Sequence, residues 1–397
     1  MPRRLIVAVL VAVAAVAASS VATAASRRPV TGPAGLRFYS PHALPPGKHG
    51  TLIWERTYHG VAALKGATND LVMYKQVGIR GRLVPVSGIV SVPKGRAPKG
   101  GWPVVSFAHG TTGIAPQCAP SRATGRTSGG YSSDVGTGPL LNSWIRAGYA
   151  VVRTDYEGLG GPGEHPYLIG RSEGYGVLDI VRAGRQLNPA LSNRVIISGH
   201  SQGGQAALWA ASLAPSYTPD LKVLGTVAFA PQSHTAEEVS LLKTQSTTSL
   251  TPIASLILRG LDIGYPSLHV SSLLTPAAAK LYPQTLSRCL SQLYPASSFG
   301  GLPLDQLVSP SADLTAATRA LASNDPDALR IKAPVVLEQG LADTTVFPAF
   351  DQQLSQELGK LGDAVAYHTY AGATHGSVIT AAAKDATAFL KRTFRHR

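Results

Sequence analysis

Apolar residues along this chain alternate between short β-branched runs and longer stretches with helical spacing. The short runs predict strands at 103–108, 149–154, 194–198 and 223–230, and a half-exposed strand at 87–92. Between them, 138–147, 173–187 and 203–214 place apolar residues on one helical face. Alternation of this kind predicts an α/β fold, with a mainly parallel sheet flanked by helices on both faces.

The alternation stops at Pro231 and resumes near Pro334. The stretch between them is rich in Leu, Ser, Pro and Thr and shows no clear strand, although several leucines suit helix faces. After it, the pattern predicts strands at 334–338 and 364–370 and helices at 349–361 and 377–392. We therefore expect a core of 25–230 and 331–397, which begins with an irregular arm over 25–50, and a helical cap or lid insertion over 231–330.

The first 24 residues have the pattern of a secretory signal peptide. Arg3 and Arg4 precede a short apolar run from Leu5 to Ala18, and Ala22-Thr23-Ala24 ends the segment. Cleavage is expected after Ala24 or one residue later, with an uncleaved anchor as the alternative. The apolar run is short for a membrane span, so an exported protein without a transmembrane segment in the mature chain is predicted.

The formal charge of +14 is spread along the 397 residues rather than gathered in one patch. The only basic cluster is the tail at 391–397, which is either a solvated terminus or a contact for anionic envelope surfaces. No basic segment is interleaved with aromatic residues, and no nucleic-acid-binding motif is found. The composition therefore excludes nucleic acid as the predicted partner.

The chain has two cysteines, Cys118 and Cys289. In an exported protein an even pair predicts a disulfide, and the alternative is two separate buried thiols. Neither cysteine belongs to a Cys-x-x-Cys motif or a Cys/His cluster, so no metal site is predicted from them.

The candidate chemistry begins at Ser201, in the run Ile196-Ile197-Ser198-Gly199-His200-Ser201-Gln202-Gly203-Gly204-Gln205. A β-branched run leads into Gly-x-Ser-x-Gly, and helix-forming residues follow. This strand–turn–helix context predicts a nucleophile elbow, in which a tight turn projects the serine hydroxyl above the sheet. The alternative is a structural turn without chemistry.

A catalytic serine needs a base and a group that orients the base. In elbow enzymes the acid and then the histidine follow the serine along the chain. Asp343 follows the strand at 334–338, and His375 follows the strand at 364–370. They are the predicted acid and base, although Asp343 can instead cap the next helix and His375 can be a surface residue.

Other acids and histidines fit these roles less well. Glu338 lies within a predicted strand, and Asp155 precedes the serine and is expected to shape a nearby loop. His200 belongs to the elbow and is expected to point away from the reacting centre. Four further histidines follow the serine: His234 and His269 lie in the insertion, His368 in a predicted strand and His396 in the tail.

An oxyanion hole should combine two backbone amides. One is expected from Gln202, directly after the serine. The other is expected from Thr111 in the run His109-Gly110-Thr111-Thr112-Gly113, which follows an early strand. The Thr111 hydroxyl is a third possible donor, and His109 is expected to be structural.

With these motifs placed, the chain resembles the secretory lipase family of α/β-hydrolases. The stretches 149–160, 165–168 and 172–174 look like that family as well, and the similarity spans roughly 80–390 and is weakest in the insertion. The resemblance implies an exported triacylglycerol lipase or carboxylesterase with a helical lid and with Ser201, Asp343 and His375 as the triad. It implies a lipid or small ester substrate, with no metal or organic cofactor; a monomer is expected.

Several functions share this scaffold. An acyltransferase, an aromatic-ester hydrolase and a peptidase are the alternatives within enzymes, because fold and triad do not separate them. A non-catalytic envelope-binding protein is the alternative from another class. The insertion is expected to set acyl-chain preference, and the sequence leaves that preference open.

Overall fold

The computed structural model describes residues 29–125, 129–239 and 243–396. The predicted signal peptide over 1–24 lies outside the described residues, so its cleavage stays a prediction. Within the described ranges, no helix combines the length and the apolarity that crossing a bilayer requires.

One nine-stranded sheet organises the fold, with strand order β1-β2-β3-β5-β4-β6-β7-β8-β9. The strands β1, β2, β3 and β5 pair antiparallel, and the neighbours from β5 through β4 to β9 pair parallel. Their bounds are Leu52–Thr57 (β1), Ala67–Val77 (β2), Leu83–Pro93 (β3), Trp102–Ala108 (β4), Ala150–Thr154 (β5), Leu191–His200 (β6), Lys222–Phe229 (β7), Val335–Gly340 (β8) and Val365–Tyr370 (β9). The predicted α/β fold is confirmed.

The two strands β1 and β2 were not predicted from the sequence. The apolar run of β2 is limited to Leu71–Tyr74, and the buried polar side chains of Lys75 and Gln76 continue the strand, so the pattern did not mark it. Lys75 is fully buried, and its Nζ donates to the carbonyl oxygens of Pro45 and Gly47 at 2.7 and 2.6 Å. This lysine thereby holds the N-terminal arm against the sheet.

Helices cover both faces of the sheet, as predicted. One buried cluster joins the sheet to α2 (Gly170–Leu187), α3 (Gln202–Tyr217) and α9 (Pro348–Lys360). A second cluster joins the opposite face to α1 (Ser132–Arg146), α10 (Val378–Ala381) and α11 (Ala383–His396). The carboxyl ends of the parallel strands, where ligand sites of open α/β sheets lie, are therefore held between two packed layers of helices.

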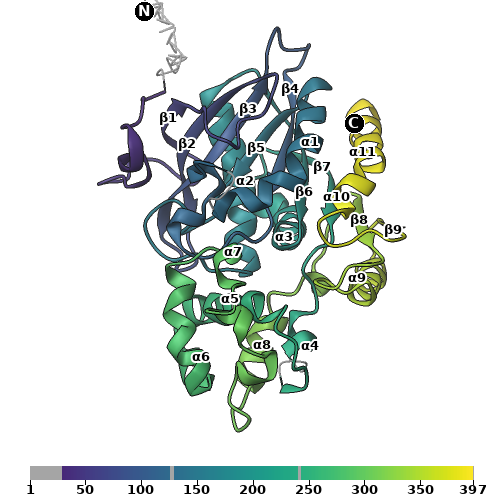
Figure 1. Ribbon diagram of the computed structural model, residues 1–397. Helices are drawn as coiled ribbons and strands as arrows, with labels where there is room; N and C mark the ends of the chain where they lie inside the picture. The colour runs from purple at the N-terminus through teal and green to yellow at the C-terminus, as the bar shows by residue number, and fades with distance from the viewer. Residues whose placement is uncertain (1–28, 126–128, 240–242, 397) are drawn as a thin grey trace, which may run out of the picture.

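The chain between β7 and β8 forms helices and 3-10 turns that gather at one end of the sheet (Figure 1). The α-helices are α4 (Thr235–Glu238), α5 (Thr251–Gly264), α6 (Pro276–Leu281), α7 (Leu290–Leu293) and α8 (Thr315–Ala322). They share an apolar core of their own, in which Leu256, Leu258 and Leu261 are buried. We call this segment the cap; its use as a domain boundary or a lid stays a prediction.

A disulfide joins Cys118 to Cys289, as the cysteine pair predicted. Cys289 precedes α7 in the cap, and Cys118 lies in the segment after β4. The two segments also share backbone contacts: Gly113 forms a β-bridge with Cys289, and Leu290 N donates to Thr112 O at 2.8 Å. The disulfide therefore ties the cap to the loop that carries Thr111.

Removing this cross-link should destabilise the protein. The bond closes a separation of 171 residues, and loss of a native disulfide typically costs about 2–5 kcal/mol of unfolding free energy. We expect the Cys118→Ser/Cys289→Ser double variant to unfold at lower urea concentration than the oxidised wild type, measured by circular dichroism. Reduced wild type is the matched control, and coincident curves for all three proteins would contradict the expectation.

Candidate active site

The elbow is built from close contacts that only glycine permits. Ser201 has φ of 59°, a left-handed value that is unusual for a residue with a side chain. A first side-chain carbon at Gly199 would lie 2.0 Å from Gly203 O, and one at Gly203 would lie 2.0 Å from Ala108 O. The turn therefore packs directly on the end of β4, and Ser201 N is fixed to Phe229 O of β7 at 2.9 Å.

Asp343 and His375 form the shortest polar contact among the predicted site residues. His375 Nδ1 lies 2.8 Å from Asp343 Oδ2, while Asp343 Oδ1 accepts from the amides of Thr345 and Val346 at 2.8 and 3.0 Å. One oxygen of the Asp343 carboxylate thus accepts from the turn before α9, while the other lies beside the His375 ring. Burial acts to raise the pKa of Asp343, but the hydrogen bond and charge of His375 and the two amides outweigh it and lower that pKa.

His375 reaches the elbow through His200, which corrects one expectation. His200 Nε2 donates to His375 O at 2.9 Å, and the two rings lie 4.6 Å apart. His200 therefore does not point away from this centre, because the loop after β9 passes over its side of the elbow. Burial and the neighbouring His375 lower the pKa of His200 to about 3, so it is a neutral hydrogen-bond donor.

Ser201 itself is 8% exposed. Its hydroxyl forms no hydrogen bond with His375 in the described structure. Such bonds are often long before substrate binds. Ser201, Asp343 and His375 all follow the carboxyl ends of parallel strands, β6, β8 and β9, and so lie at one edge of the sheet.

One of the two expected oxyanion donors directly follows Ser201, and the loop that carries the other passes close to this serine. Gln202 is the first residue of α3, where a backbone amide has no partner within the helix. A first side-chain carbon at Gly110 would lie 3.6 Å from Ser201 Cβ, so the loop before Thr111 passes close to the serine. The Thr111 hydroxyl, the third donor considered from the sequence, shares a 2.6 Å hydrogen bond with Tyr167 OH, in which either oxygen can be the donor.

A buried polar network beneath Gln202 was missed by sequence reasoning. Gln202 Nε2 lies 2.8 Å from both His165 Nε2 and Glu173 Oε1. Glu173 is fully buried and also accepts from Leu168 N at 2.8 Å. The stretches 165–168 and 172–174 were noted as family-like, but no local pattern showed that they meet behind the elbow.

Other candidates lie outside this arrangement. Asp155 accepts from Ser87 Oγ at 2.6 Å and from Ser121 N at 3.0 Å, and so shapes the loop after β5 as expected. Glu338 lies within β8 and bonds Tyr370 and His368 of β9 at 2.7 and 3.1 Å. Neither carboxylate contacts His375.

An apolar pocket opens between the cap and the elbow. On the core side it is bordered by Gln232 and Thr345. The backbone N–H of Gln232 donates to Ser201 O at 3.1 Å, and Thr345 lies two residues after Asp343. From the cap, mainly apolar residues line it: Val239, Leu250, Ile253, Ala254, Ile257, Leu258 and Leu304. The pocket therefore has mainly apolar walls, which also include Thr235 and Glu238, and it reaches residues next to Ser201 and Asp343 rather than the triad side chains themselves.

The buried Glu173 should make stability depend on pH. Burial raises the pKa of Glu173 from 4.5 to about 8, against the lowering effect of its bonds to Gln202 and Leu168. Between these two pH values Glu173 holds a proton in the folded protein and releases it in the unfolded chain. The stability that protonated Glu173 contributes to the folded protein is therefore fully present below about pH 4.5 and is lost as the pH rises through about 8. Between these values the slope can reach about 1.4 kcal/mol per pH unit.

Glu173→Gln removes this titration and keeps an acceptor for Gln202. We expect the free energy of unfolding of the variant to fall less steeply than that of wild type from about pH 5 to about pH 8, measured by urea denaturation. The exposed Glu164→Gln is the control for loss of one carboxyl group and should follow wild type. Parallel pH profiles for wild type and Glu173→Gln would show that Glu173 does not hold the proton.

Part of the chain is similar in sequence to known lipases. The family model described as Secretory lipase matches residues 138–301. Lipase A of Moesziomyces aphidis is 31% identical over 159 residues, which cover 38% of this chain and 32% of that protein. A probable inactive lipase of Mycobacterium tuberculosis is 30% identical over 207 residues, which cover 51% of this chain and 44% of that protein. The chain thus spans less than half the length of these relatives.

Solved structures show the same fold over most of the chain. Candida antarctica lipase A in its closed state matches with a TM-score of 0.74 and 21% identity, covering 88% of this chain and 83% of that one. The rice cell wall degrading esterase LipA from Xanthomonas oryzae matches with a TM-score of 0.68 and 19% identity, covering 85% and 95%. Together these findings confirm the predicted resemblance: part of the chain is similar to the secretory lipases, and its fold is the one that these α/β-hydrolase structures share.

Proposed function

We propose that this protein is an exported serine hydrolase that cleaves carboxylic esters, with acylglycerols as its substrate class. The observation that carries the proposal is the Asp343–His375 pair at 2.8 Å beside an elbow serine held at φ of 59°. Kinship with secretory lipases supports the same reaction class. The apolar pocket next to the elbow supports a substrate with a hydrocarbon chain.

In the proposed mechanism, Ser201 Oγ attacks the ester carbonyl while His375 takes its proton. Asp343 holds the imidazole with Nδ1 protonated and stabilises the imidazolium. The amides of Gln202 and Thr111 donate to the oxyanion of the tetrahedral intermediate. His375 then protonates the departing alcohol, and a water that it activates releases the acid from Ser201.

Export rests on three observations. Residues 1–24 have the composition of a signal peptide, and the matching family is secretory. The disulfide between Cys118 and Cys289 suits an oxidising compartment. The mature protein would then act outside the cytoplasm.

A fluorophosphonate probe tests the reaction class directly. It should label wild type covalently at one serine, and the Ser201→Ala variant should be unlabelled and lose about 10⁴-fold or more in ester hydrolysis. Peptide mass spectrometry identifies the labelled residue. Ser198→Ala, on the strand before the elbow, is the control and should still be labelled.

The same assay addresses the non-catalytic alternative. One relative carries the name of a probable inactive lipase, so family membership by itself does not establish turnover. If folded wild type is neither labelled nor active on any ester, the enzyme proposal fails and a binding role takes its place.

Acyl-chain length is expected to depend on the pocket. Ile257 of α5 lines it, and Ile257→Trp should fill the space that several methylenes of a chain would occupy. Since each buried methylene is worth about 0.8 kcal/mol, we expect the ratio of kcat/KM for p-nitrophenyl laurate over butyrate to fall by about 10-fold or more.

Ile263→Trp is the matched control, because Ile263 is also half-buried on α5 but lines a different hollow. It should leave that ratio near the wild-type value. Equal effects of the two substitutions would show that this pocket does not bind the acyl chain, and would leave the proposed triad untouched.

A further inference from the structure

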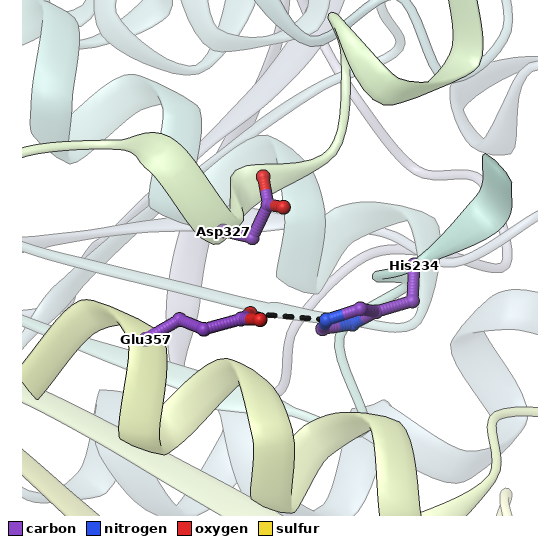
Figure 2. A group of neighbouring side chains, drawn as sticks. All are labelled: His234, Asp327 and Glu357. Carbon is purple, nitrogen blue, oxygen red and sulfur yellow. Dashed lines mark hydrogen bonds and ion pairs between the residues drawn. The ribbon is translucent and has the colours of Figure 1, made fainter. Parts of the chain in front are cut away.

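Three potential metal ligands meet outside the active site. His234, Asp327 and Glu357 each offer one ligand atom, and these atoms lie within 4.8 Å of one another. Figure 2 shows the imidazole of His234 and the carboxylate of Glu357 facing each other, with Asp327 beside them. His234 Nε2 and Glu357 Oε2 are 3.0 Å apart.

The three residues come from segments far apart in the sequence. His234 directly precedes α4 at the start of the cap, and Asp327 lies in the 3-10 turn Pro326–Ala328 at its end. Glu357 is on α9 of the core, the helix that follows the Asp343 loop. The cluster therefore lies where both ends of the cap meet the catalytic layer.

The charges in this cluster are unbalanced. Two carboxylate groups, of Asp327 and Glu357, each have an oxygen within 4.8 Å of a nitrogen of one imidazole. Within the described residues, neither Asp327 nor Glu357 forms an ion pair with a lysine or arginine.

The ligands are also oriented from behind, as metal ligands are in proteins. His234 Nδ1 lies 3.2 Å from Ser233 Oγ, and that hydroxyl bonds Asp351 at 3.2 Å, so Nε2 is the nitrogen that faces the carboxylates. The imidazole is 1% exposed and stacks on Phe350 at 5.4 Å between ring centres. Gln353 Nε2 donates to the other oxygen of Glu357 at 2.9 Å.

The donor set favours one kind of ion. An imidazole nitrogen with two carboxylate oxygens suits Zn²⁺, whereas Ca²⁺ and Mg²⁺ prefer oxygen ligands alone. At zinc distances of about 2.0–2.2 Å, tetrahedral ligand atoms lie about 3.4 Å apart, so small side-chain rotations would bring the three atoms into range. The side chain of Glu357 is 28% exposed, which leaves a side open for ion entry and a water ligand.

We propose that His234, Asp327 and Glu357 form a structural Zn²⁺ site that fastens both ends of the cap to α9. The ion would neutralise the carboxylates and join three segments that no disulfide connects. This site is separate from the proposed ester-cleaving centre, so its test does not depend on catalysis.

Zinc binding is measured on untagged, full-length mature protein after removal of metal with a chelator. Calorimetric titration with Zn²⁺ should give one site per chain, and excess Zn²⁺ should raise Tm by at least about 3 °C. Ca²⁺ and Mg²⁺ at the same concentration should leave Tm within about 1 °C. Asp327→Asn and Glu357→Gln should each weaken Zn²⁺ binding at least about 10-fold and remove the shift in Tm.

His368→Gln is the matched control, because His368 also pairs with a glutamate, Glu338, at 3.1 Å but belongs to no three-ligand group in the described residues. It should bind Zn²⁺ as wild type does. Absence of a Zn²⁺-dependent shift in wild type would overturn the proposal and leave His234–Glu357 as an ion pair. Undiminished binding by both Asp327→Asn and Glu357→Gln would overturn it too. Because Tm and calorimetry report on folded protein with or without turnover, these outcomes are independent of the fluorophosphonate result.

Discussion

The close approach of the elbow to the end of β4 is the contact on which the candidate site depends. Gly203 packs so tightly on Ala108 O that any side chain would overlap it, and Gly199 packs equally tightly on Gly203. The contact holds Ser201 in a left-handed conformation and sets the first turn of α3 beside the His109–Gly113 loop. The two expected oxyanion donors are thus placed by backbone packing, which is stiffer than placement by side chains.

The cap is fixed to this loop at several points. The disulfide and the Gly113–Cys289 bridge connect α7 to the segment after β4, and Thr111 bonds Tyr167, whose ring packs in the cap core. Movement of the cap would therefore act on the same loop that carries a proposed oxyanion donor. The proposed zinc site lies at the base of the cap, where its two ends meet α9.

In several places, contacts between segments that are distant in the sequence are made by buried polar groups rather than by apolar side chains. Glu173 and His165 hold the side chain of Gln202 beneath the elbow, and Lys75 holds the arm by two carbonyl oxygens. Such groups are stable inside a protein only with partners, and their charge states adjust to burial. Burial lowers the pKa of His165 and raises that of Glu173, so both shifts favour the neutral form of each group under the serine.

By itself, the sequence determined the α/β alternation, the elbow and the order of serine, acid and histidine, because these depend on local patterns with known backbone requirements. It also indicated the cysteine pair. Strands β1 and β2 were not predicted. In β2 the apolar run is limited to Leu71–Tyr74, and the buried Lys75 and Gln76 that continue it have their partners in distant segments. Only the tertiary structure decided that His200 lies against His375, that Glu173 reaches Gln202, and that His234, Asp327 and Glu357 converge. Each of these contacts joins residues from separate elements, and their proximity follows from packing rather than from spacing along the chain.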